Sequence, residues 1–281
     1  MARYDYYRPS TLEEASRLRT SIEGSRFVAG ATDVMVRIRS GAMKPSALIS
    51  LRSIAGLAGI VEGESTVVGA ATLVADIVSH PGLRERHPVL CEAAGRLGSE
   101  QIRNAATIGG NLCNASPCAD TAPALLVLDA RIRIWGPGGT REVTIEEFFV
   151  GPGQTCLGPG ELLYSIVLPA PQPGTRASFQ KKGRVAMDLA TVSVAALMQM
   201  DGRTCRKARF AAGSVAPLPL RLHKAETLLE GAQITAALAT EARVLAEQGV
   251  KPISDVRSNA QYRRHLVGVY VQRAIEALAF G

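Results

Sequence analysis

The sequence of 281 residues has few aromatic residues (5%, with one tryptophan), and it lacks any long apolar run. No apolar stretch reaches the roughly 18 residues that a membrane-spanning helix needs, so we expect none. The amino-terminal stretch MARYDYYRPSTLEEA contains no apolar signal-peptide core, which predicts a cytoplasmic protein. The net charge of +7 comes mostly from scattered arginines rather than from a basic block interleaved with aromatics. That distribution argues against nucleic-acid binding and favours an anionic cofactor or an acidic partner surface.

A disulfide framework and an obvious catalytic constellation are also missing. The five cysteines, at 91, 113, 118, 156 and 205, are odd in number and irregularly spaced, which is typical of reduced thiols in a reducing compartment. Cys113 and Cys118 lie five apart, but no second close pair completes a zinc or iron–sulfur ligand set. We expect these two to pack as small side chains under a loop. No Ser–His–Asp, Cys–His or paired-carboxylate arrangement is present, so a bound cofactor would have to carry the chemistry.

The most informative segment is NAATIGGNLCNASPCADTAPALLVLDA, residues 104–130. Gly109 and Gly110 can adopt positive φ and admit a ligand close to the main chain, whose bare N–H groups would suit a pyrophosphate. Hydroxyl and amide partners are offered nearby by Thr107, Asn111, Asn114 and Ser116. Asp120 precedes Pro123 and an apolar run, where an N-cap belongs, and its carboxylate can accept a ribose hydroxyl.

A second loop follows a short apolar strand at Arg26–Ala29. The loop, Gly30–Asp33, leads into residues 34–39, which either alternate as a strand or turn helical. A strand, a glycine and a helix in this order form an arrangement that binds phosphate through free N–H groups and the helix dipole. Taken alone, the segment also fits a plain strand-to-helix turn, and a lone Gly-Gly pair fits a tight turn.

The remaining pattern predicts an α+β protein. Ser10 and Glu13 have capping-box spacing and should open a helix that runs to about Thr20. Strands are expected at 45–51, 66–71, 130–135, 141–145 and 161–168, with helices at 72–78 and 88–97. Pro169–Pro173 is the predicted domain boundary. It separates residues 1–173, which we divide into two α+β subdomains near residue 55, from residues 174–281. The latter should form a small antiparallel sheet, with strands at 177–180, 189–200 and 207–213, followed by a helical tail from Leu222.

Together the two loops resemble the FAD-binding medium subunit of the molybdenum hydroxylases, the carbon monoxide, xanthine and nicotinate dehydrogenase group. The resemblance rests on AGATD at 29–33, TIGGN at 107–111 and SPCAD at 116–120, with SDVRS at 254–258 and YRR at 262–264 near the carboxyl end. It covers nearly the whole chain. It implies a two-subdomain FAD-binding domain of the PCMH type, followed by a small antiparallel sheet with a carboxyl-terminal helical bundle.

The resemblance also implies a set of cofactor-binding residues. The first loop would wrap the diphosphate, the second would close on the pyrophosphate and ribityl chain, and Asp120 would bind a sugar hydroxyl. Leucines would pack beside the cofactor, Leu162 or Leu163 bordering the flavin. The lysine reaching it would be Lys181, with Lys182 as the alternative. The full set is Phe27, Val28, Ala29, Gly30, Ala31, Thr32, Asp33, Val34, Leu97, Ala106, Thr107, Gly109, Gly110, Asn111, Asn114, Ser116, Ala119, Asp120, Leu162, Leu163 and Lys181.

In one position the chain departs from the family pattern. Ala31 stands where relatives commonly have a second glycine, and we expect the alanine to be tolerated through a negative φ. The four histidines lie outside both loops, so the resemblance implies non-covalent FAD.

The implied function is that of an electron-transfer subunit without substrate chemistry of its own. Electrons would come from two iron–sulfur clusters in a small partner subunit and pass through FAD to NAD, oxygen or another acceptor. The loop from Gln180 to Asp188 would flank the acceptor side of the flavin. The molybdenum cofactor would reside in a large partner subunit, the whole being a dimer of heterotrimers, a heterohexamer. Two alternatives remain: a stand-alone flavin oxidase of related fold, which would need a catalytic base in the second domain, and a cofactor-free scaffold protein.

Overall fold

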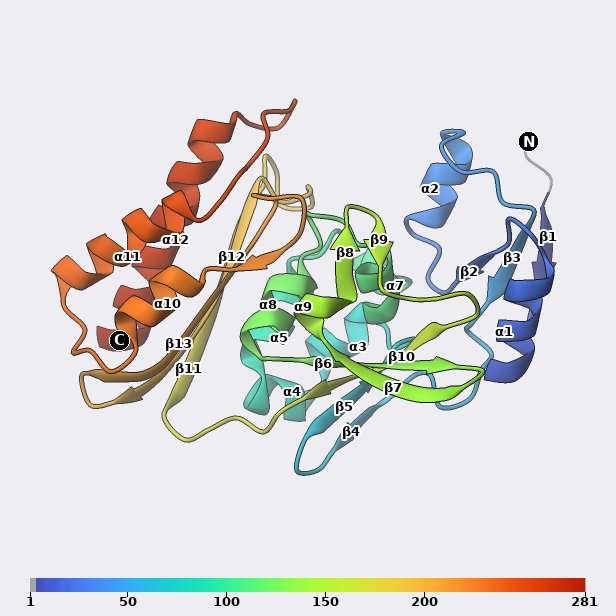
Figure 1. Cartoon of the computed structure of the whole chain (residues 1–281), viewed down its shortest axis with the longest axis horizontal. Coiled ribbons are helices and arrows are strands. Elements are labelled where there is room, and N and C mark those ends of the chain that lie inside the picture. Colours follow the sequence, from blue (N-terminus) through green and yellow to red (C-terminus); the bar gives the residue numbers. More distant parts are fainter. Residues whose placement is uncertain (1–3, 281) are drawn as a thin grey trace.

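The computed structural model describes residues 4–280, which form three main sheets with helices packed between and outside them (Figure 1). Helices and strands occur in mixed order along the chain, so the predicted α+β class is confirmed. No helix in residues 4–280 is long and apolar enough to cross a membrane. Figure 1 shows the three sheets side by side, with the amino-terminal sheet on the right and the carboxyl-terminal sheet on the left.

The amino-terminal unit is a three-stranded parallel sheet of order β1-β3-β2 with two helices. Its elements are β1 (Asp5–Tyr7), α1 (Leu12–Ser21), β2 (Arg26–Val28), α2 (Val34–Arg39) and β3 (Ala47–Ser50). Helix α1 is capped by Thr11, whose hydroxyl accepts from the Glu14 N–H at 3.1 Å, while the Glu14 carboxylate accepts from the Ser10 N–H at 2.9 Å. The predicted capping box of Ser10 and Glu13 is therefore wrong, because Thr11 is the N-cap residue and the Glu14 carboxylate accepts from the Ser10 N–H rather than from that of Thr11.

A five-stranded antiparallel sheet of order β4-β5-β10-β6-β7 forms the middle of the molecule. Its central strand, β10, is buried over almost its whole length, as its continuous apolar sequence predicts. Strands β6 and β7 form the expected hairpin, in which Ile132 and Ile134 face the core. The strands are β4 (Ile60–Glu62), β5 (Thr66–Gly69), β6 (Arg131–Gly136), β7 (Gly139–Thr144) and β10 (Leu162–Leu168), with a small separate pair, β8 (Phe149–Gly151) and β9 (Gln154–Thr155).

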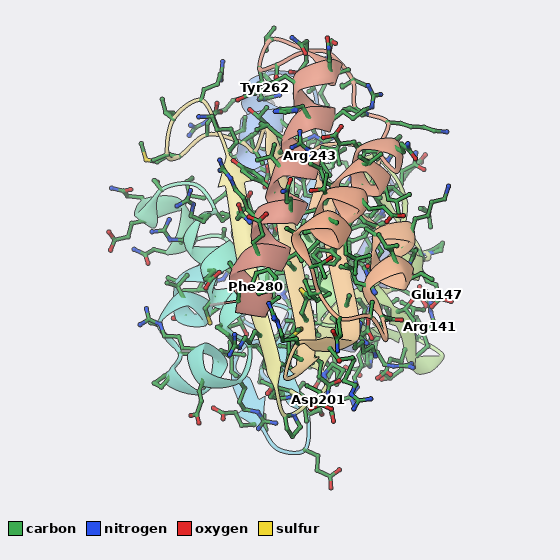
Figure 2. The ribbon with its side chains drawn as sticks, turned by 90° about the vertical axis from the view of Figure 1, so that its left-hand side faces the viewer. Arg141, Glu147, Asp201, Arg243, Tyr262 and Phe280 are labelled. Atoms are coloured by element: carbon green, nitrogen blue, oxygen red, sulfur yellow. The ribbon has the colours of Figure 1, made fainter. Side chains whose placement is uncertain are left out.

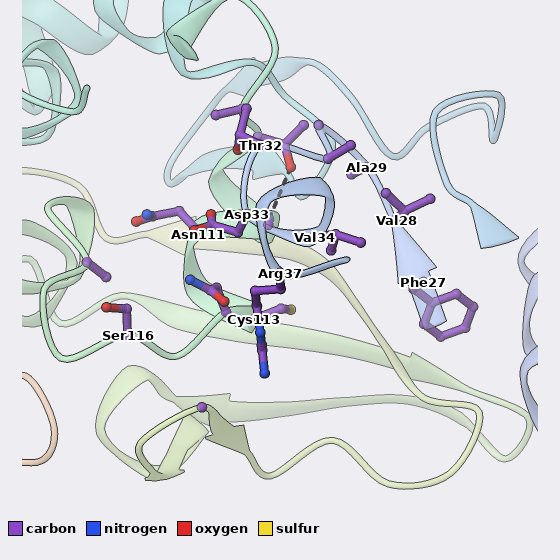
Figure 3. Close-up of a pocket in the computed structure, with 18 of the residues that line it drawn as sticks. Phe27, Val28, Ala29, Thr32, Asp33, Val34, Arg37, Asn111, Cys113 and Ser116 are labelled. Carbon is purple, nitrogen blue, oxygen red and sulfur yellow. Dashed lines mark hydrogen bonds between the residues drawn. The ribbon is translucent and has the colours of Figure 1, made fainter. Parts of the chain in front are cut away.

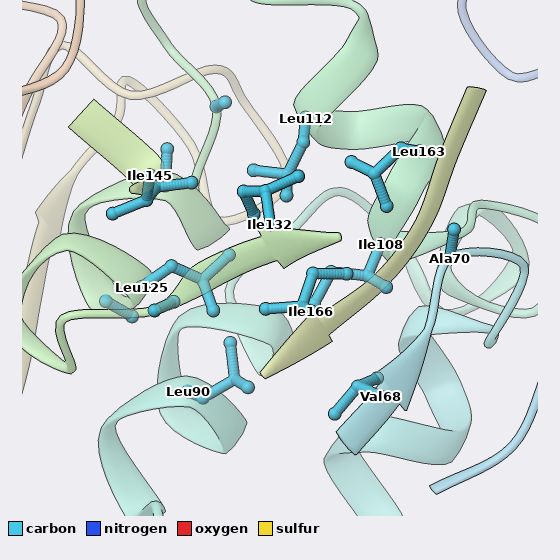
Figure 4. Packing of buried hydrophobic residues seen from close by; sticks show 14 of the residues in the cluster. Val68, Ala70, Leu90, Ile108, Leu112, Leu125, Ile132, Ile145, Leu163 and Ile166 are labelled. Atoms are coloured by element: carbon cyan, nitrogen blue, oxygen red, sulfur yellow. The ribbon is translucent and has the colours of Figure 1, made fainter. Parts of the chain in front are cut away.

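Helices lie between this sheet and the next. They are α3 (Val74–Ser79), α4 (Pro81–Arg86), α5 (Pro88–Gly95), α6 (Glu100–Arg103), α7 (Ile108–Cys113), α8 (Thr121–Val127) and α9 (Ile145–Phe148). Every residue of α8 is buried, because the helix contacts the middle unit on one side and strands β12 and β13 on the other. Figure 4 shows this core, where Leu125 of α8 packs near Ile132 and Leu90.

The carboxyl-terminal unit is a four-stranded antiparallel sheet covered by three helices. Its elements are β11 (Thr175–Lys182), β12 (Val192–Asp201), β13 (Thr204–Gly213), β14 (Leu220–Arg221), α10 (His223–Leu229), α11 (Ala236–Gln248) and α12 (Ala260–Phe280). Figure 2 views these helices over the sheet, with Tyr262 and Phe280 near the two ends of α12. The other face of the sheet packs on α5 and α8.

Ion pairs and a charge-assisted hydrogen bond connect the carboxyl-terminal sheet to the middle unit. The Asp129 carboxylate, after α8, accepts from Arg209 and, at 3.0 Å, from Arg221. The Phe179 N–H of β11 donates to the Glu92 carboxylate of α5 at 3.0 Å. These contacts and the burial of α8 hold the two units in one fixed arrangement, which positions the site described next.

Candidate cofactor-binding site

A cleft of about 560 Å³ brings the two glycine loops together. Figure 3 shows Thr32 and Asp33 of the first loop close to Asn111, Cys113 and Ser116 of the second. Seventeen of the 21 predicted residues line this cleft: residues 27–34 and Leu97, Ala106, Thr107, Gly110, Asn111, Asn114, Ser116, Ala119 and Asp120. Gly109, Leu162 and Leu163 line an adjoining recess, and Lys181 contacts Asp120.

The first loop joins β2 to α2, so residues 34–39 are helical rather than extended. Within the described chain, the main-chain N–H groups of Gly30, Ala31, Thr32 and Asp33 donate to no main-chain acceptor. They are therefore free to bind an anion entering the cleft. The expectation of a negative φ at Ala31 is wrong, because its φ is +63°. The turn needs this left-handed residue, and alanine adopts it at some cost in strain.

Position 30 must be glycine because the second loop packs directly against it, and not because its φ is positive. A Cβ built on Gly30 would lie 2.1 Å from the Ala105 carbonyl oxygen and 2.8 Å from the Ala106 Cα. No side chain fits there without moving the backbone. The two loops thus touch main chain to main chain, and this contact fixes the width of the cleft.

The glycine pair of the second loop serves packing more than ligand access. The Gly109 N–H donates to the Ala70 carbonyl at 2.9 Å, and a Cβ on Gly109 would lie 2.6 Å from that oxygen. The Gly110 N–H donates to the Thr107 hydroxyl at 3.1 Å, which caps α7. The prediction of bare N–H groups here is therefore wrong for both glycines, whose N–H groups are already bonded within the chain.

Side chains supply the polar groups of the second loop instead. The Asn111 amide oxygen accepts from the Thr121 hydroxyl at 2.6 Å, which leaves its NH₂ group as a donor toward the cleft. The Ser116 hydroxyl accepts from the Cys118 N–H at 3.2 Å. Cys113 is exposed and lines both the cleft and the recess, and Cys118 is half-buried and also lines the cleft. The expectation that these two cysteines pack under the loop is therefore wrong.

Asp120 does not cap α8 through its side chain, contrary to the prediction. Its Oδ2 instead lies 2.7 Å from Lys181 Nζ, and its Oδ1 is buried without a partner in the described chain. Burial raises the pKa of Asp120 to about 6, although the charges of Lys181 and Arg96 lower it. A buried carboxylate oxygen that lacks a donor is suited to accept a ligand hydroxyl.

Lys181, rather than Lys182, reaches the site. Its side chain is 3% exposed and also donates to the Arg96 carbonyl at 2.8 Å. Adjacent residues of a strand point to opposite faces of the sheet, so Lys182 is directed away and is exposed. The carboxyl-terminal sheet thereby places a cation against Asp120, which lines a cleft built mainly by the first two units.

An apolar recess of about 140 Å³ opens beside the cleft. It is lined mainly by apolar side chains and by Gly109 and Gly110 of the second loop; the large apolar residues are Phe27, Leu51, Leu57, Leu162 and Leu163. Its apolar walls suit a ring whose polar tail continues into the cleft.

Sequence reasoning missed several lining residues. Three cations at the cleft, Arg19, Arg26 and Arg37, come from different elements and share no motif. The loop 183–191 between β11 and β12 lines the cleft from the carboxyl-terminal unit through Met187, Asp188 and Leu189. The first two belong to the loop that was expected beside the flavin, whereas Leu189 was expected in a strand. The apolar spacing gave no signal for the three arginines, which only the tertiary structure brings to one cleft.

These residues fit FAD on three counts. Free N–H groups with nearby arginines suit a diphosphate, the orphan Asp120 oxygen suits a sugar or ribityl hydroxyl, and the recess suits a ring. When bound, FAD supplies the electron-transfer chemistry, and the protein binds and orients it.

Comparisons with known proteins agree with this geometry. Residues 2–171 match the family described as the FAD binding domain in molybdopterin dehydrogenase, and residues 177–278 match the CO dehydrogenase flavoprotein C-terminal domain. The chain is 33% identical to the xanthine dehydrogenase FAD-binding subunit of Escherichia coli O157:H7, covering 98% of this chain and 96% of that protein. It is also 33% identical to the carbon monoxide dehydrogenase medium chain of Afipia carboxidovorans, covering 97% and 96%.

A solved structure has the same fold. The carbon monoxide dehydrogenase from Hydrogenophaga pseudoflava, in a form lacking the Mo-pyranopterin moiety of the molybdenum cofactor, includes a chain that superposes with a TM-score of 0.96. The two chains are 32% identical, and the match covers 98% of this chain and 97% of that one. With both domain families matched and relatives aligned nearly end to end, the chain belongs to the family of FAD-binding subunits of the molybdenum hydroxylases, which are oxidoreductases.

Proposed function

We propose that this chain is the electron-exit subunit of a heteromeric molybdenum hydroxylase. It would receive electrons from two iron–sulfur clusters of a small partner subunit and pass them through non-covalent FAD to NAD, oxygen or another acceptor. Substrate would react in a large partner subunit that holds the molybdenum cofactor. The similarity of the whole chain to FAD-binding subunits supports this proposal.

The observation that carries the proposal is the meeting of three units around one cleft. The first loop supplies free N–H groups, the second supplies amide and hydroxyl groups, and the carboxyl-terminal sheet supplies Lys181. We propose that the 21 predicted residues bind the cofactor together with Arg19, Arg26 and Arg37, which would act as cations near the phosphates. In that arrangement Asp120 accepts a hydroxyl, while Leu162 and Leu163 both contact a ring in the recess.

We further propose a dimer of heterotrimers located in the cytoplasm. All five cysteines are free, as predicted for a reducing compartment. The scattered positive charge suits an acidic partner face.

Two other functions are less well supported. A stand-alone flavin oxidase would need a substrate site with a catalytic base, whereas the relatives aligned along the whole chain are subunits of larger enzymes. A scaffold that has lost its cofactor would have little reason to keep an unpartnered buried carboxylate oxygen facing a cleft.

The experiment is the visible absorption spectrum of the purified full chain, followed by acid release and identification of the cofactor. Flavin bands and released FAD are expected, and affinity capture should then recover molybdenum- and iron-containing partners. A colourless protein that does not take up added FAD would overturn the proposal. FAD without either metal partner would favour the stand-alone oxidase.

A further inference from the structure

Arg263 of α12 is the largest side chain that the core encloses almost completely, with 2% of its surface exposed. A guanidinium is rarely buried without partners that compensate for its lost hydration. Its Nη1 donates to the carbonyls of Thr191 at 3.0 Å and Ser214 at 2.9 Å, and its Nη2 donates to Asp255 Oδ1 at 2.6 Å. The two carbonyls flank the paired ends of β12 and β13, where Ser193 lies opposite Gly213.

The first carbonyl ends the loop 183–191. The Thr191 N–H donates to the Lys182 carbonyl at 2.7 Å and closes the neck of this loop. Between these residues, Met187, Asp188 and Leu189 line the cleft. The guanidinium therefore holds the carboxyl end of a segment that forms part of the cleft wall.

The second carbonyl belongs to Ser214, which follows β13 and contacts the second cofactor loop through its N–H. Ser214 has a φ of +67°, and its N–H donates to the Pro117 carbonyl at 2.7 Å. Pro117 lies between Ser116 and Asp120, both of which line the cleft. The Arg263 guanidinium is thus linked through Ser214 to the loop that carries Asp120.

Asp255 completes the arrangement from the segment before α12. Its Oδ1 also accepts from the main-chain N–H of Arg257 at 2.8 Å, so the carboxylate is oriented before it meets Arg263. Through Arg263, the amino-terminal end of α12, marked by Tyr262 in Figure 2, is bonded directly to the loop 183–191 at Thr191 and, through Ser214, to the loop 116–120.

We propose that Arg263, which lies outside the cleft, is a positioning residue for the cofactor site. It holds the loop 183–191 and the loop 116–120 in fixed positions relative to each other. This inference rests on the proposed binding of FAD in the cleft. Lysine at this position keeps the charge but has a single amine, which cannot bridge two carbonyls and a carboxylate with the planar fork of arginine.

The test compares Arg263→Met and Arg263→Lys with Arg264→Met in the full chain. Arg264 is the matched control, since it is adjacent and exposed, and its side chain makes no hydrogen bond within the described residues. Three quantities are measured on folded protein well below the unfolding temperature: the Kd for added FAD, the visible spectrum of the bound flavin, and the rate of tryptic cleavage after Arg184. Arg184 is exposed within the loop 183–191 and reports on its mobility.

Arg263→Met should raise the Kd for FAD at least tenfold, shift the flavin bands and speed cleavage after Arg184 at least fivefold. Arg263→Lys should recover part of each effect, and Arg264→Met should stay within twofold of the unmodified chain. A lowered unfolding temperature with unchanged Kd, spectrum and cleavage rate would show a purely structural role and overturn the inference.

The experiment distinguishes failure of the proposed function from failure of the inference about Arg263. If the unmodified chain binds no FAD, the proposed function fails, while faster cleavage in Arg263→Met still shows that the residue holds the loop. If Arg263→Met does not fold, Arg263→Lys and Asp255→Asn decide. Asp255→Asn removes the carboxylate but keeps both carbonyl contacts, so it should raise the Kd for FAD a few-fold. If neither variant changes the Kd or the cleavage rate, the inference is wrong.

Discussion

Lys181 Nζ and Asp120 Oδ2 lie 2.7 Å apart, with 3% and 5% of their side chains exposed, and they belong to different structural units. The carboxylate stands after the second glycine loop, whereas the ammonium comes from β11 of the carboxyl-terminal sheet. A pair this well buried stabilises the junction only while both partners are present, since either charge alone would be left without compensation.

Replacing Lys181 with methionine should therefore lower the free energy of unfolding by about 3 kcal/mol at pH 8. The loss should be smaller at pH 5, because Asp120, with its pKa raised to about 6, is then mostly protonated. Urea denaturation at both pH values measures the difference. Lys182→Met is the control, and this exposed neighbour should change stability by less than about 0.5 kcal/mol. Equal effects of the two substitutions would contradict the role given to Lys181.

Asp120 should also make FAD affinity depend on pH. A ligand hydroxyl donates to the ionised carboxylate, so affinity should fall as pH drops through about 6, by no more than about tenfold per pH unit. Folding depends on pH in the opposite direction, because the pKa of Asp120 is higher in the folded chain than in the unfolded one. The stability that Asp120 contributes is fully present below pH 3.8, its unfolded-state pKa, and is lost as pH rises through about 6.

Titrating the chain with FAD by flavin fluorescence from pH 5 to 8 measures the affinity. In Asp120→Asn, which has no titrating group at this position, the profile should be flat over this range. A slope that survives in Asp120→Asn would assign the pH dependence to another group.

Ala31 offers a test of backbone strain. Its φ of +63° costs a non-glycine residue about 1–2 kcal/mol, a cost that glycine avoids. Glycine in turn loses more conformational entropy on folding than alanine, which costs about 0.5–1 kcal/mol. Ala31→Gly should thus raise the free energy of unfolding by about 0.5–1 kcal/mol. Ala29→Gly, in the same loop but without a positive φ, should lower it. Thermal unfolding of both variants decides, and a loss of stability in Ala31→Gly would show that the loop relaxes around alanine.

Much of the fold follows from local sequence signals. The β6–β7 hairpin shows alternating Arg and Ile around a Gly-rich turn, and β10 shows a continuous apolar run, so both were predicted within a residue or two. The two loops were likewise found from glycines beside short polar residues, which suit a ligand approaching the main chain.

What the sequence does not reveal is which distant groups meet. Asp120 has the local pattern of an N-cap, but an ammonium 61 positions further along the chain competes for its carboxylate. Ala31 adopts a conformation that its residue type disfavours, because the turn geometry is imposed by packing. Arg263 carries no motif that distinguishes it from the exposed Arg264, and only the tertiary structure places it against two carbonyls.

The contact between the two cofactor loops leads to the strongest prediction. In Gly30→Ala the new Cβ would lie 2.1 Å from the Ala105 carbonyl oxygen, so the loops must separate. The free N–H groups of Gly30–Asp33 would then move away from Asn111 and Asp120, and FAD affinity should fall at least about a hundredfold, or about 2.7 kcal/mol. Isothermal titration with FAD measures this loss.

Gly138→Ala provides the control, because a Cβ at Gly138, in the β6–β7 turn, would meet nothing within 4 Å and that glycine has no positive φ. It should bind FAD like the unmodified chain. If Gly30→Ala also retains its affinity, the backbone contact does not set the width of the cleft, and the diphosphate must be held by the second loop and the arginines. If affinity falls while the unfolding temperature stays within a few degrees, the contact acts on the ligand site itself rather than on the fold.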